Sequence, residues 1–259
     1  MTLVTQEKST NTILYQYFHE IPDKNLALLA LVLLLIVSVI SFGLSLWTKS
    51  AFTLFIPLTG FLIAAGYACR LHMISNPKLF TFAAMQILLI VPALFLAAVN
   101  YTCFGRVINM RRSRSSKVML WMSSLGFIIF DILCLIIQSF GGTLLTNKDP
   151  KIMKVGINLI LVGILLAVIV NVFFIGTLIY INTTMSFEVN TNVWIALYVT
   201  MGCLLVRNIY RAIEFVQNYI SKNGIGYLSS HEIYMYIFDF TMLFICFVVF
   251  CLLHYGFYL

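Results

Sequence analysis

The residues best suited to chemistry in this sequence are charged side chains that interrupt long apolar stretches. Arg207, Arg211 and Glu214 are spaced i, i+4 and i+7, so they share one face of a helix. Asp239 lies in the next apolar stretch. A charge in membrane hydrocarbon costs at least ~2.5–3.5 kcal/mol, so it needs a partner or an aqueous cavity. The pattern predicts a network of buried ion pairs.

Counting residues from the expected loops places these groups in one half of a bilayer. Arg211 precedes Tyr219 by eight residues and Asp239 follows His231 by eight. Both therefore lie roughly 12 Å deep, at ~1.5 Å per residue. Further polar residues are expected on the same side, namely Arg70, Gln86, Asp131 and Gln138.

The ionisable residues of this predicted cluster balance in charge. The bases are Arg70, Arg207 and Arg211, and the acids are Asp131, Glu214 and Asp239. Balanced pairs can remain buried, whereas removing one partner leaves an uncompensated charge. Such a network either only locks the helices together or lines a pocket for a headgroup or a proton. Intramembrane ionisable groups favour the second interpretation.

The elements that must position these residues are membrane-spanning helices. The chain is 61% hydrophobic and 10% charged, whereas a soluble domain carries about 25% charged residues. A helix needs roughly 20 apolar residues to cross a bilayer. We therefore predict an all-α membrane protein, a seven-transmembrane-helix bundle over residues 26–259 after a polar segment, 1–25. The expected spans are 26–46, 52–72, 80–104, 117–140, 155–181, 193–218 and 234–255.

The net charge of +7 comes from basic residues in short gaps between apolar stretches. This placement favours contact with lipid headgroups and argues against a nucleic-acid partner. The densest basic run is Arg106, Arg111, Arg112, Arg114 and Lys117. The positive-inside rule makes that loop cytoplasmic, with the N-terminus outside and the C-terminus cytoplasmic. Glycosylation at Asn182, in the sequon Asn182-Thr183-Thr184, would require the opposite orientation.

Two local signals mark helix ends. Gly141-Gly142 predicts the end of the fourth helix, and Ser229-x-x-Glu232 is typical of a capping box that opens the seventh. Motifs of catalysis are missing, since the sequence contains no G-x-x-x-x-G-K-[ST], H-E-x-x-H or G-x-S-x-G. We therefore expect no enzyme activity, no cofactor and no metal site.

The last two predicted helices carry a longer motif. It reads Arg207-Asn208-Ile209-Tyr210-Arg211-Ala212-Ile213-Glu214-Phe215, then Gly226-Tyr227-Leu228, His231-Glu232, Tyr236 and Phe238-Asp239. Earlier matches are Gly66-Tyr67, Arg70, Gln86, Pro92-Ala93, Ala97-Ala98, Tyr101, Gly105-Arg106, Asp131, Gln138 and Gly141-Gly142. Together they resemble the signature of the fungal Rta-like family, also called lipid-translocating exporters, over residues ~60–256.

The resemblance implies seven helices, an outside N-terminus and residence in the plasma membrane or related membranes. Members of the family are linked to translocation of sphingoid long-chain bases, to resistance against toxic amphiphiles and to porphyrin uptake. The motif also adds Tyr210 and Tyr236 to the residues expected to contact a substrate. The chain departs from the family in having His254-Tyr255-Gly256 in place of His-Pro-Gly, and in lacking a glutamate between Phe61 and Ala65 that could pair with Arg70.

We therefore hypothesise a transporter, or a translocation-promoting protein, for amphiphilic lipids such as sphingoid bases. Asp131, Glu214 and Asp239 would hold an amine headgroup, and Arg207 and Arg211 would neutralise those acids when the site is empty. The expected partners are the amphiphile and the bilayer, and no sequence feature specifies an oligomeric state. A seven-helix lipid receptor or sensor, and a porphyrin or haem-related uptake protein, are the alternatives.

Overall fold

The structure is a computed structural model that describes residues 22–77, 79–109, 114–145, 149–184, 190–220, 226–228 and 230–257. Within these residues, seven helices are long and apolar enough to cross a membrane, which confirms the predicted fold class. The first six spans are α2 (Lys24–Thr48), α3 (Phe55–Ser75), α4 (Leu79–Asn109), α5 (Arg114–Leu145), α6 (Pro150–Thr184) and α7 (Thr191–Ile220). The seventh joins α8 (Glu232–Met235), η2 (Tyr236–Phe240) and α9 (Thr241–Leu252). Short 3₁₀ turns, η1 (Ala51–Leu54) and η3 (Tyr255–Phe257), precede α3 and follow α9.

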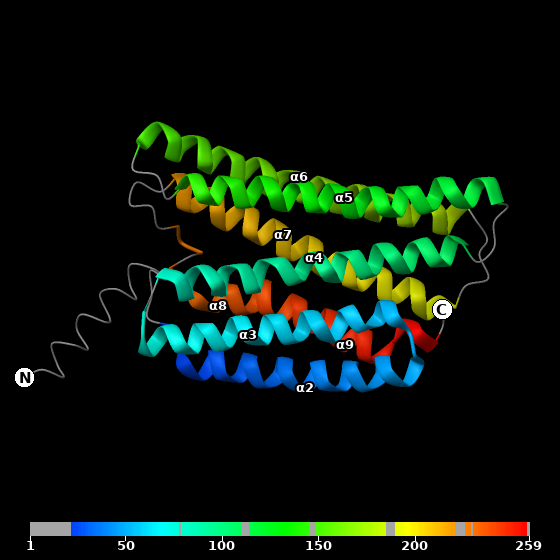
Figure 1. The fold of residues 1–259 in the computed structure, drawn as a ribbon. Coiled ribbons are helices and arrows are strands. Elements are labelled where there is room, and N and C mark those ends of the chain that lie inside the picture. Colours follow the sequence, from blue (N-terminus) through cyan, green and yellow to red (C-terminus); the bar gives the residue numbers. More distant parts are fainter. Residues whose placement is uncertain are drawn as a thin grey trace, which may run out of the picture.

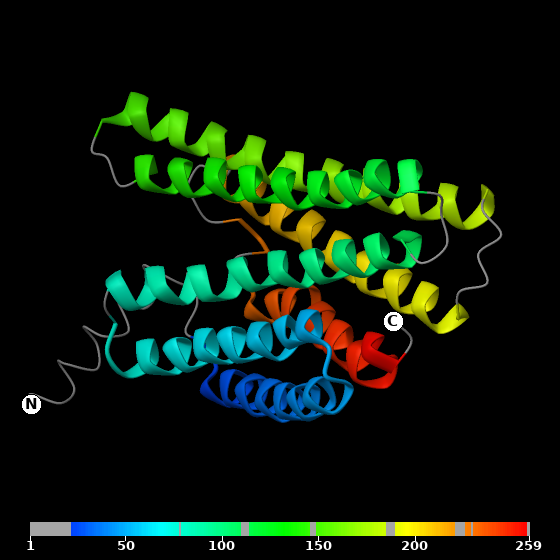
Figure 2. The same cartoon turned by 45° about the vertical axis from the view of Figure 1, so that its right-hand side comes forward.

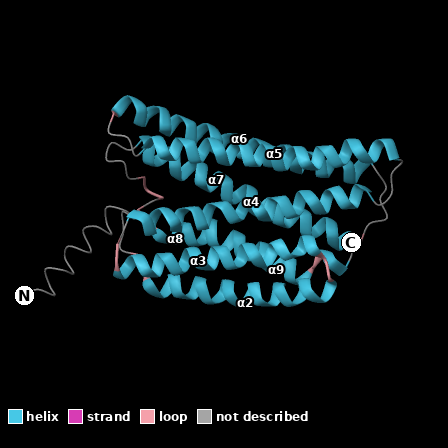
Figure 3. Ribbon diagram, in the orientation of Figure 1, coloured by secondary structure: helices cyan, strands magenta, loops and turns pink. Residues whose placement is uncertain are grey.

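The helices run alternately up and down, and each packs against the next in the chain (Figures 1 and 2). The bundle closes where α9 packs against α2, and α4 also contacts α7 across the middle. Figure 3 shows helices and no strand in the described part of the chain. Because successive helices are antiparallel, one end of the bundle gathers the start of α2, the end of α7 and the start of α8.

Close backbone packing joins α5 to α6. A Cβ added at Gly141 would lie 2.8 Å from the Gly156 carbonyl oxygen, and one at Gly163 would lie 3.2 Å from the Cys134 carbonyl oxygen. Small residues at matching positions let two membrane helices approach this closely. The prediction that Gly141-Gly142 ends the helix is wrong, because α5 continues to Leu145 and Gly141 serves this contact instead.

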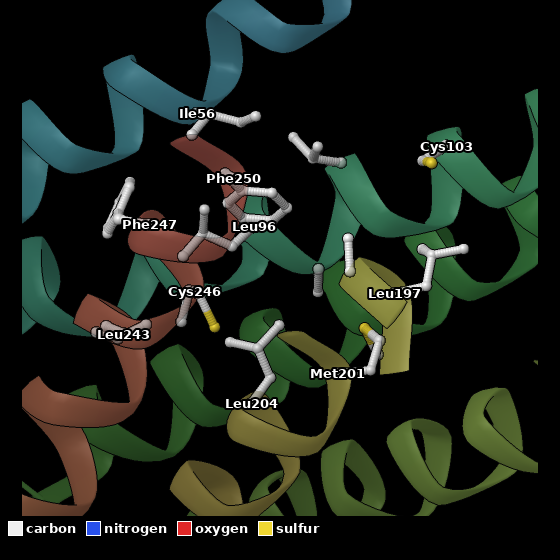
Figure 4. Close-up of a cluster of buried hydrophobic side chains, with 14 of the residues drawn as sticks. Ile56, Leu96, Cys103, Leu197, Met201, Leu204, Leu243, Cys246, Phe247 and Phe250 are labelled. Carbon is white, nitrogen blue, oxygen red and sulfur yellow. The ribbon is translucent and has the colours of Figure 1, made fainter. Parts of the chain in front are cut away.

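An apolar core fills the middle of the bundle (Figure 4). The side chains labelled in the figure come from α3, α4, α7 and α9; they are Ile56, Leu96, Cys103, Leu197, Met201, Leu204, Leu243, Cys246, Phe247 and Phe250. The outer faces are apolar too: Ile169 and Phe173 of α6, for example, are exposed. This distribution fits a protein whose outer surface contacts lipid rather than water.

The seventh span changes geometry near its start, directly after α8. Residues Tyr236–Phe240 form a π-helical turn, in which hydrogen bonds skip one residue further than in an α-helix. The Thr241 hydroxyl donates to the Tyr236 carbonyl oxygen at 2.8 Å, which supplies that wider turn with an added hydrogen bond. π-Turns inside α-helices occur frequently at functional sites, and this one contains Asp239.

Candidate functional site

One carboxylate binds two arginines near the end of the bundle where α7 finishes. Asp239 Oδ1 lies 2.5 Å from Arg207 Nε, and Asp239 Oδ2 lies 2.5 Å from Arg211 Nη2. The side chains of Arg207 and Asp239 are only 4% and 3% exposed. Arg211 and Asp239, which were expected at equal depth, thus form a direct ion pair between α7 and the π-turn.

The network has an accessible edge. Arg211 Nη1 pairs with Glu214 Oε2 at 3.2 Å, and these two side chains are 19% and 17% exposed. Tyr210 is buried beside them and stacks on Phe238, with ring centroids 5.6 Å apart. The Tyr210 hydroxyl has no hydrogen-bond partner among the described residues. A buried hydroxyl with this unused capacity next to an accessible ion pair can accept or donate a bond to an incoming polar group.

Three local features aim these side chains. The i, i+4 and i+7 spacing puts Arg207, Arg211 and Glu214 on one face of α7. The π-turn shifts Asp239 around its helix toward that face. On the other side, Arg207 Nη2 donates to the Leu89 carbonyl oxygen at 3.0 Å. Leu89 lies inside α4, three residues before Pro92, and a backbone carbonyl oxygen has a second lone pair that can accept this bond.

A second ion pair lies at the same end of the bundle. Arg70 Nη2 bonds Glu232 Oε1 at 2.6 Å, and Glu232 Oε2 accepts the backbone N–H of Asp23 at 2.7 Å. Glu232 therefore joins α3, α8 and the start of α2. The Arg70 guanidinium also lies over the Tyr236 ring, 5.9 Å from its centroid, and Tyr236 stacks near Tyr67 at 6.2 Å.

Glu232 is a site residue that sequence reasoning assigned to another role. The capping-box prediction is wrong, because α8 begins at Glu232 with His231 before it and the Glu232 carboxylate binds Arg70. Ser229 lies outside the described residues. The signal that could have found Glu232 is the missing family glutamate before Gly66-Tyr67, since Arg70 still required an acid. With Glu232 included, the cluster is neutral: Arg70, Arg207 and Arg211 balance Glu214, Glu232 and Asp239.

Asp131 does not join this cluster. Its Oδ2 accepts the Tyr101 hydroxyl at 2.8 Å, and Tyr101 lies twelve residues beyond Leu89 on α4. The two levels are therefore about 18 Å apart along the helix axis, at ~1.5 Å per residue. The expectation that Asp131 meets the arginines is therefore wrong. Its depth was counted from Gly141, whereas α5 continues four residues further to Leu145, which accounts for about 6 Å of the difference.

The predicted glutamines are not part of the ion-pair network. Gln86 is half-buried on α4, one turn before Leu89. Gln138 is half-buried on α5 and packs against Gly163 of α6. Among the described residues, neither side chain has a hydrogen bond to the arginines or their acids. The cluster that the structure brings together comprises Arg70, Arg207, Tyr210, Arg211, Glu214, Glu232, Tyr236 and Asp239.

A separate uncharged network lies within the apolar core. Asn100 Oδ1 accepts the Tyr255 hydroxyl at 2.9 Å and the Thr200 hydroxyl at 3.1 Å. Tyr255 is fully buried, in the position where the family has proline. These bonds tie α4 and α7 to the end of the seventh span. Asn100 lies on α4 between the core residues Leu96 and Cys103, and Thr200 lies on α7 beside the core residue Met201. The neutral network is therefore embedded in the apolar core, whereas the charged cluster lies nearer the end of the bundle where α7 finishes.

Comparison with known proteins identifies the family. The family model described as "RTA1 like protein" matches residues 56–259. This chain belongs to the RTA1-like family. Three relatives from Saccharomyces cerevisiae are Protein RTM1, 30% identical over 79% of this chain, Protoporphyrin uptake protein 1, 31% identical over 71%, and Protein RTA1, 28% identical over 73%. The Arg70, Arg207, Arg211 and Asp239 contacts all lie within the matched residues.

The chain spans 68, 63 and 61% of the lengths of those three relatives, respectively. No solved structure matches this RTA1-like chain. Family membership and the seven apolar helices together make it an integral multi-pass membrane protein.

Proposed function

We propose that this RTA1-like protein moves amphiphilic lipids across the membrane and that the charge cluster holds their headgroup. The observation that supports this proposal most strongly is the neutral network of Arg207, Arg211, Glu214 and Asp239. The network is buried in one half of the bundle yet accessible at Glu214. The preferred substrate class is an amphiphile with a cationic amine, such as a sphingoid long-chain base. Its hydrocarbon tail would lie along the apolar helix surfaces.

Headgroup binding would proceed by ion-pair exchange. An incoming ammonium takes the place of Arg211 beside Glu214, and the freed Arg211 guanidinium keeps its bond to Asp239. The Tyr210 hydroxyl can bond the same headgroup. Exchange within a neutral network leaves few charges unpaired at any stage, which lowers the cost of moving a charged group into the membrane interior. No covalent bond changes, so the proposed activity is transport and not catalysis.

The apolar core separates this headgroup site from the opposite end of the bundle. Passage of the headgroup therefore requires the helices that supply this core to move relative to one another. Alternating exposure of one site to the two membrane faces is the usual way in which transporters meet this requirement. The plasma membrane is the proposed location, with the N-terminus and the charge cluster on the outer side.

A porphyrin is the second candidate substrate, because one relative carries the name Protoporphyrin uptake protein 1. The carboxylates of a porphyrin would bind to the basic residues of the same network, whereas an amine headgroup would bind to its acids. The porphyrin carboxylates would pair with Arg211 and displace Glu214. The sign of the headgroup charge therefore distinguishes the two candidates.

The test uses purified protein in liposomes that contain a labelled sphingoid base in one leaflet. Wild type is compared with Glu214→Gln and with Asp149→Asn as a matched control. Asp149 is an exposed carboxylate at the start of α6, at the same end of the bundle, where an asparagine can still cap the helix. We expect wild type and Asp149→Asn to accelerate transfer between leaflets and Glu214→Gln to lose most of that acceleration.

Transfer no faster than in protein-free liposomes would refute a translocating activity for this amphiphile. Saturable binding without transfer would favour a lipid receptor or sensor. Transfer of a porphyrin but not of the base, lost on Arg211→Gln, would select the second substrate.

A further inference from the structure

Asp131 is an isolated charge in the membrane interior. It is the only charged residue between Lys117 and Leu145, and the facing stretches 80–105 of α4 and 155–184 of α6 contain none. The residue is 6% exposed. A carboxylate buried in hydrocarbon without a cationic partner is strongly disfavoured as an ion and tends to take up a proton.

The surroundings of Asp131 come from three helices. On α4, Tyr101 donates to Asp131 Oδ2 at 2.8 Å. The Tyr101 ring packs against Phe127 of α5 at 5.5 Å and Phe174 of α6 at 4.6 Å between centroids. On α5 itself, the nearest titratable neighbour is the buried Cys134. These rings keep water from the junction of α4, α5 and α6, which we call the Asp131 junction.

A second buried group in this junction lacks a partner. Asn171 of α6 is 3% exposed, and its Oδ1 has no hydrogen-bond donor among the described residues. The Phe127 and Phe174 rings are in contact at 5.0 Å. Asp131 follows Phe127 by four residues, and Asn171 precedes Phe174 by three. Because α5 and α6 are antiparallel, both steps lead in the same direction, by about 6 Å and about 4.5 Å. Asp131 and Asn171 therefore lie at nearly the same depth.

We propose that the Asp131 junction is a proton-binding site, separate from the charge cluster. The protonated carboxyl of Asp131 donates its O–H to Asn171 Oδ1 and accepts the Tyr101 hydroxyl on its other oxygen. Proton binding thus removes the buried charge and supplies the donor that Asn171 lacks. The inference does not rest on amphiphile transport, since it concerns other residues about 18 Å away along the helix axis.

The two neighbours stabilise opposite states of the site. The hydrogen bond from Tyr101 stabilises the ionised form of Asp131 more than the protonated form, because hydrogen bonds to charged acceptors are stronger. With its unpartnered Oδ1 toward Asp131, the Asn171 amide can accept a hydrogen bond only from the protonated carboxyl. Tyr101→Phe should therefore tighten proton binding, and Asn171→Leu should weaken it. One net hydrogen bond corresponds to a shift of roughly 0.5–1 pH unit in the midpoint of protonation.

The test is labelling of the full-length protein in lipid nanodiscs with dicyclohexylcarbodiimide across a pH series. This apolar reagent adds the O–H of a protonated carboxyl across one of its C=N bonds. Labelled residues are identified by mass spectrometry. Asp239 provides an internal control, since it is as buried as Asp131 but is held ionised by two arginines.

We expect Asp131 to be labelled with an efficiency that falls as pH rises, while Asp239 stays unlabelled. Tyr101→Phe should move the labelling midpoint to higher pH, and Asn171→Leu should move it to lower pH. Labelling of Asp239 to the same extent as Asp131, or no labelling of Asp131 at any pH, overturns the proposal. That comparison uses wild type alone, so it holds even where a variant fails to fold.

Discussion

Replacing Asp239 by asparagine should destabilise the protein more than any other single loss of charge in the cluster. Each Asp239 oxygen holds one arginine at 2.5 Å. An asparagine keeps one acceptor oxygen but turns an NH₂ group toward the second guanidinium, leaving that charge buried and unpaired. Removing one partner of a buried ion pair costs about 3–5 kcal/mol. At about 2–4 °C per kcal/mol for a chain of this size, Tm should fall by roughly 6–20 °C.

The assay is thermal unfolding in nanodiscs, followed by size-exclusion chromatography after heating. Glu214→Gln is the comparison, because Glu214 has one partner in the cluster and is partly exposed, so its loss should cost roughly 1 kcal/mol. The double variant Asp239→Leu with Arg207→Met removes one charge of each sign and leaves Arg211 paired with Glu214. It should be more stable than Asp239→Asn, since apolar groups often replace a buried ion pair without loss.

The reasoning is refuted if Asp239→Asn unfolds within about 1 kcal/mol of wild type. It also fails if the double variant is no more stable than the single one. Either result would mean that the two arginines have other compensation and that Asp239 does not organise the cluster.

Three further predictions concern the contacts that hold the cluster and the bundle. Glu232→Gln should lower the free energy of unfolding by about 1.5–3 kcal/mol, which is the usual contribution of a hydrogen bond to a charged group. The reason is that Glu232 links Arg70 to the start of α2. The loss is measured as a decrease in Tm. Gly141→Ala should lower the free energy of unfolding by about 1–3 kcal/mol, since its Cβ would meet the α6 backbone. The Cβ of Gly142→Ala meets nothing within 4 Å, so this variant should be neutral or stabilising by up to about 1 kcal/mol. Equal effects of the two variants would contradict the close α5–α6 packing. Tyr255→Phe should cost about 1 kcal/mol in the same assay, because Asn100 loses one donor but keeps Thr200, and an unchanged Tm would show that the bond contributes nothing.

Hydropathy and helical spacing were sufficient to predict seven spans and the equal depth of Arg211 and Asp239, which form an ion pair in the structure. Both follow from simple rules, since apolar length selects membrane helices and an i, i+4, i+7 pattern fixes one face. In two antiparallel helices joined by a loop, residues that are equally far from the loop along each helix lie at the same depth in the membrane.

The partners of Arg70 and Asp131 could not be predicted in the same way. Glu232 lies at the start of a helix, where a capping role is the ordinary expectation, and only the tertiary structure shows that α3 passes beside it. Asp131 was misplaced because a glycine pair suggested a helix end, whereas close packing against α6 was the stronger requirement. The π-turn at Asp239 has no sequence signal of its own, because it depends on which backbone groups pair.

The central claim, that the charge cluster receives a cationic headgroup, is tested most directly by changing only the charge of the substrate. Transfer of a sphingoid base and of its N-acetylated, uncharged counterpart should be measured in liposomes with wild type and with Glu214→Gln. We predict that wild type transfers the amine faster and that Glu214→Gln abolishes this preference by slowing the amine alone. Equal transfer of the two lipids by wild type, or an unchanged preference in Glu214→Gln, would contradict the assignment of the cluster as the headgroup site.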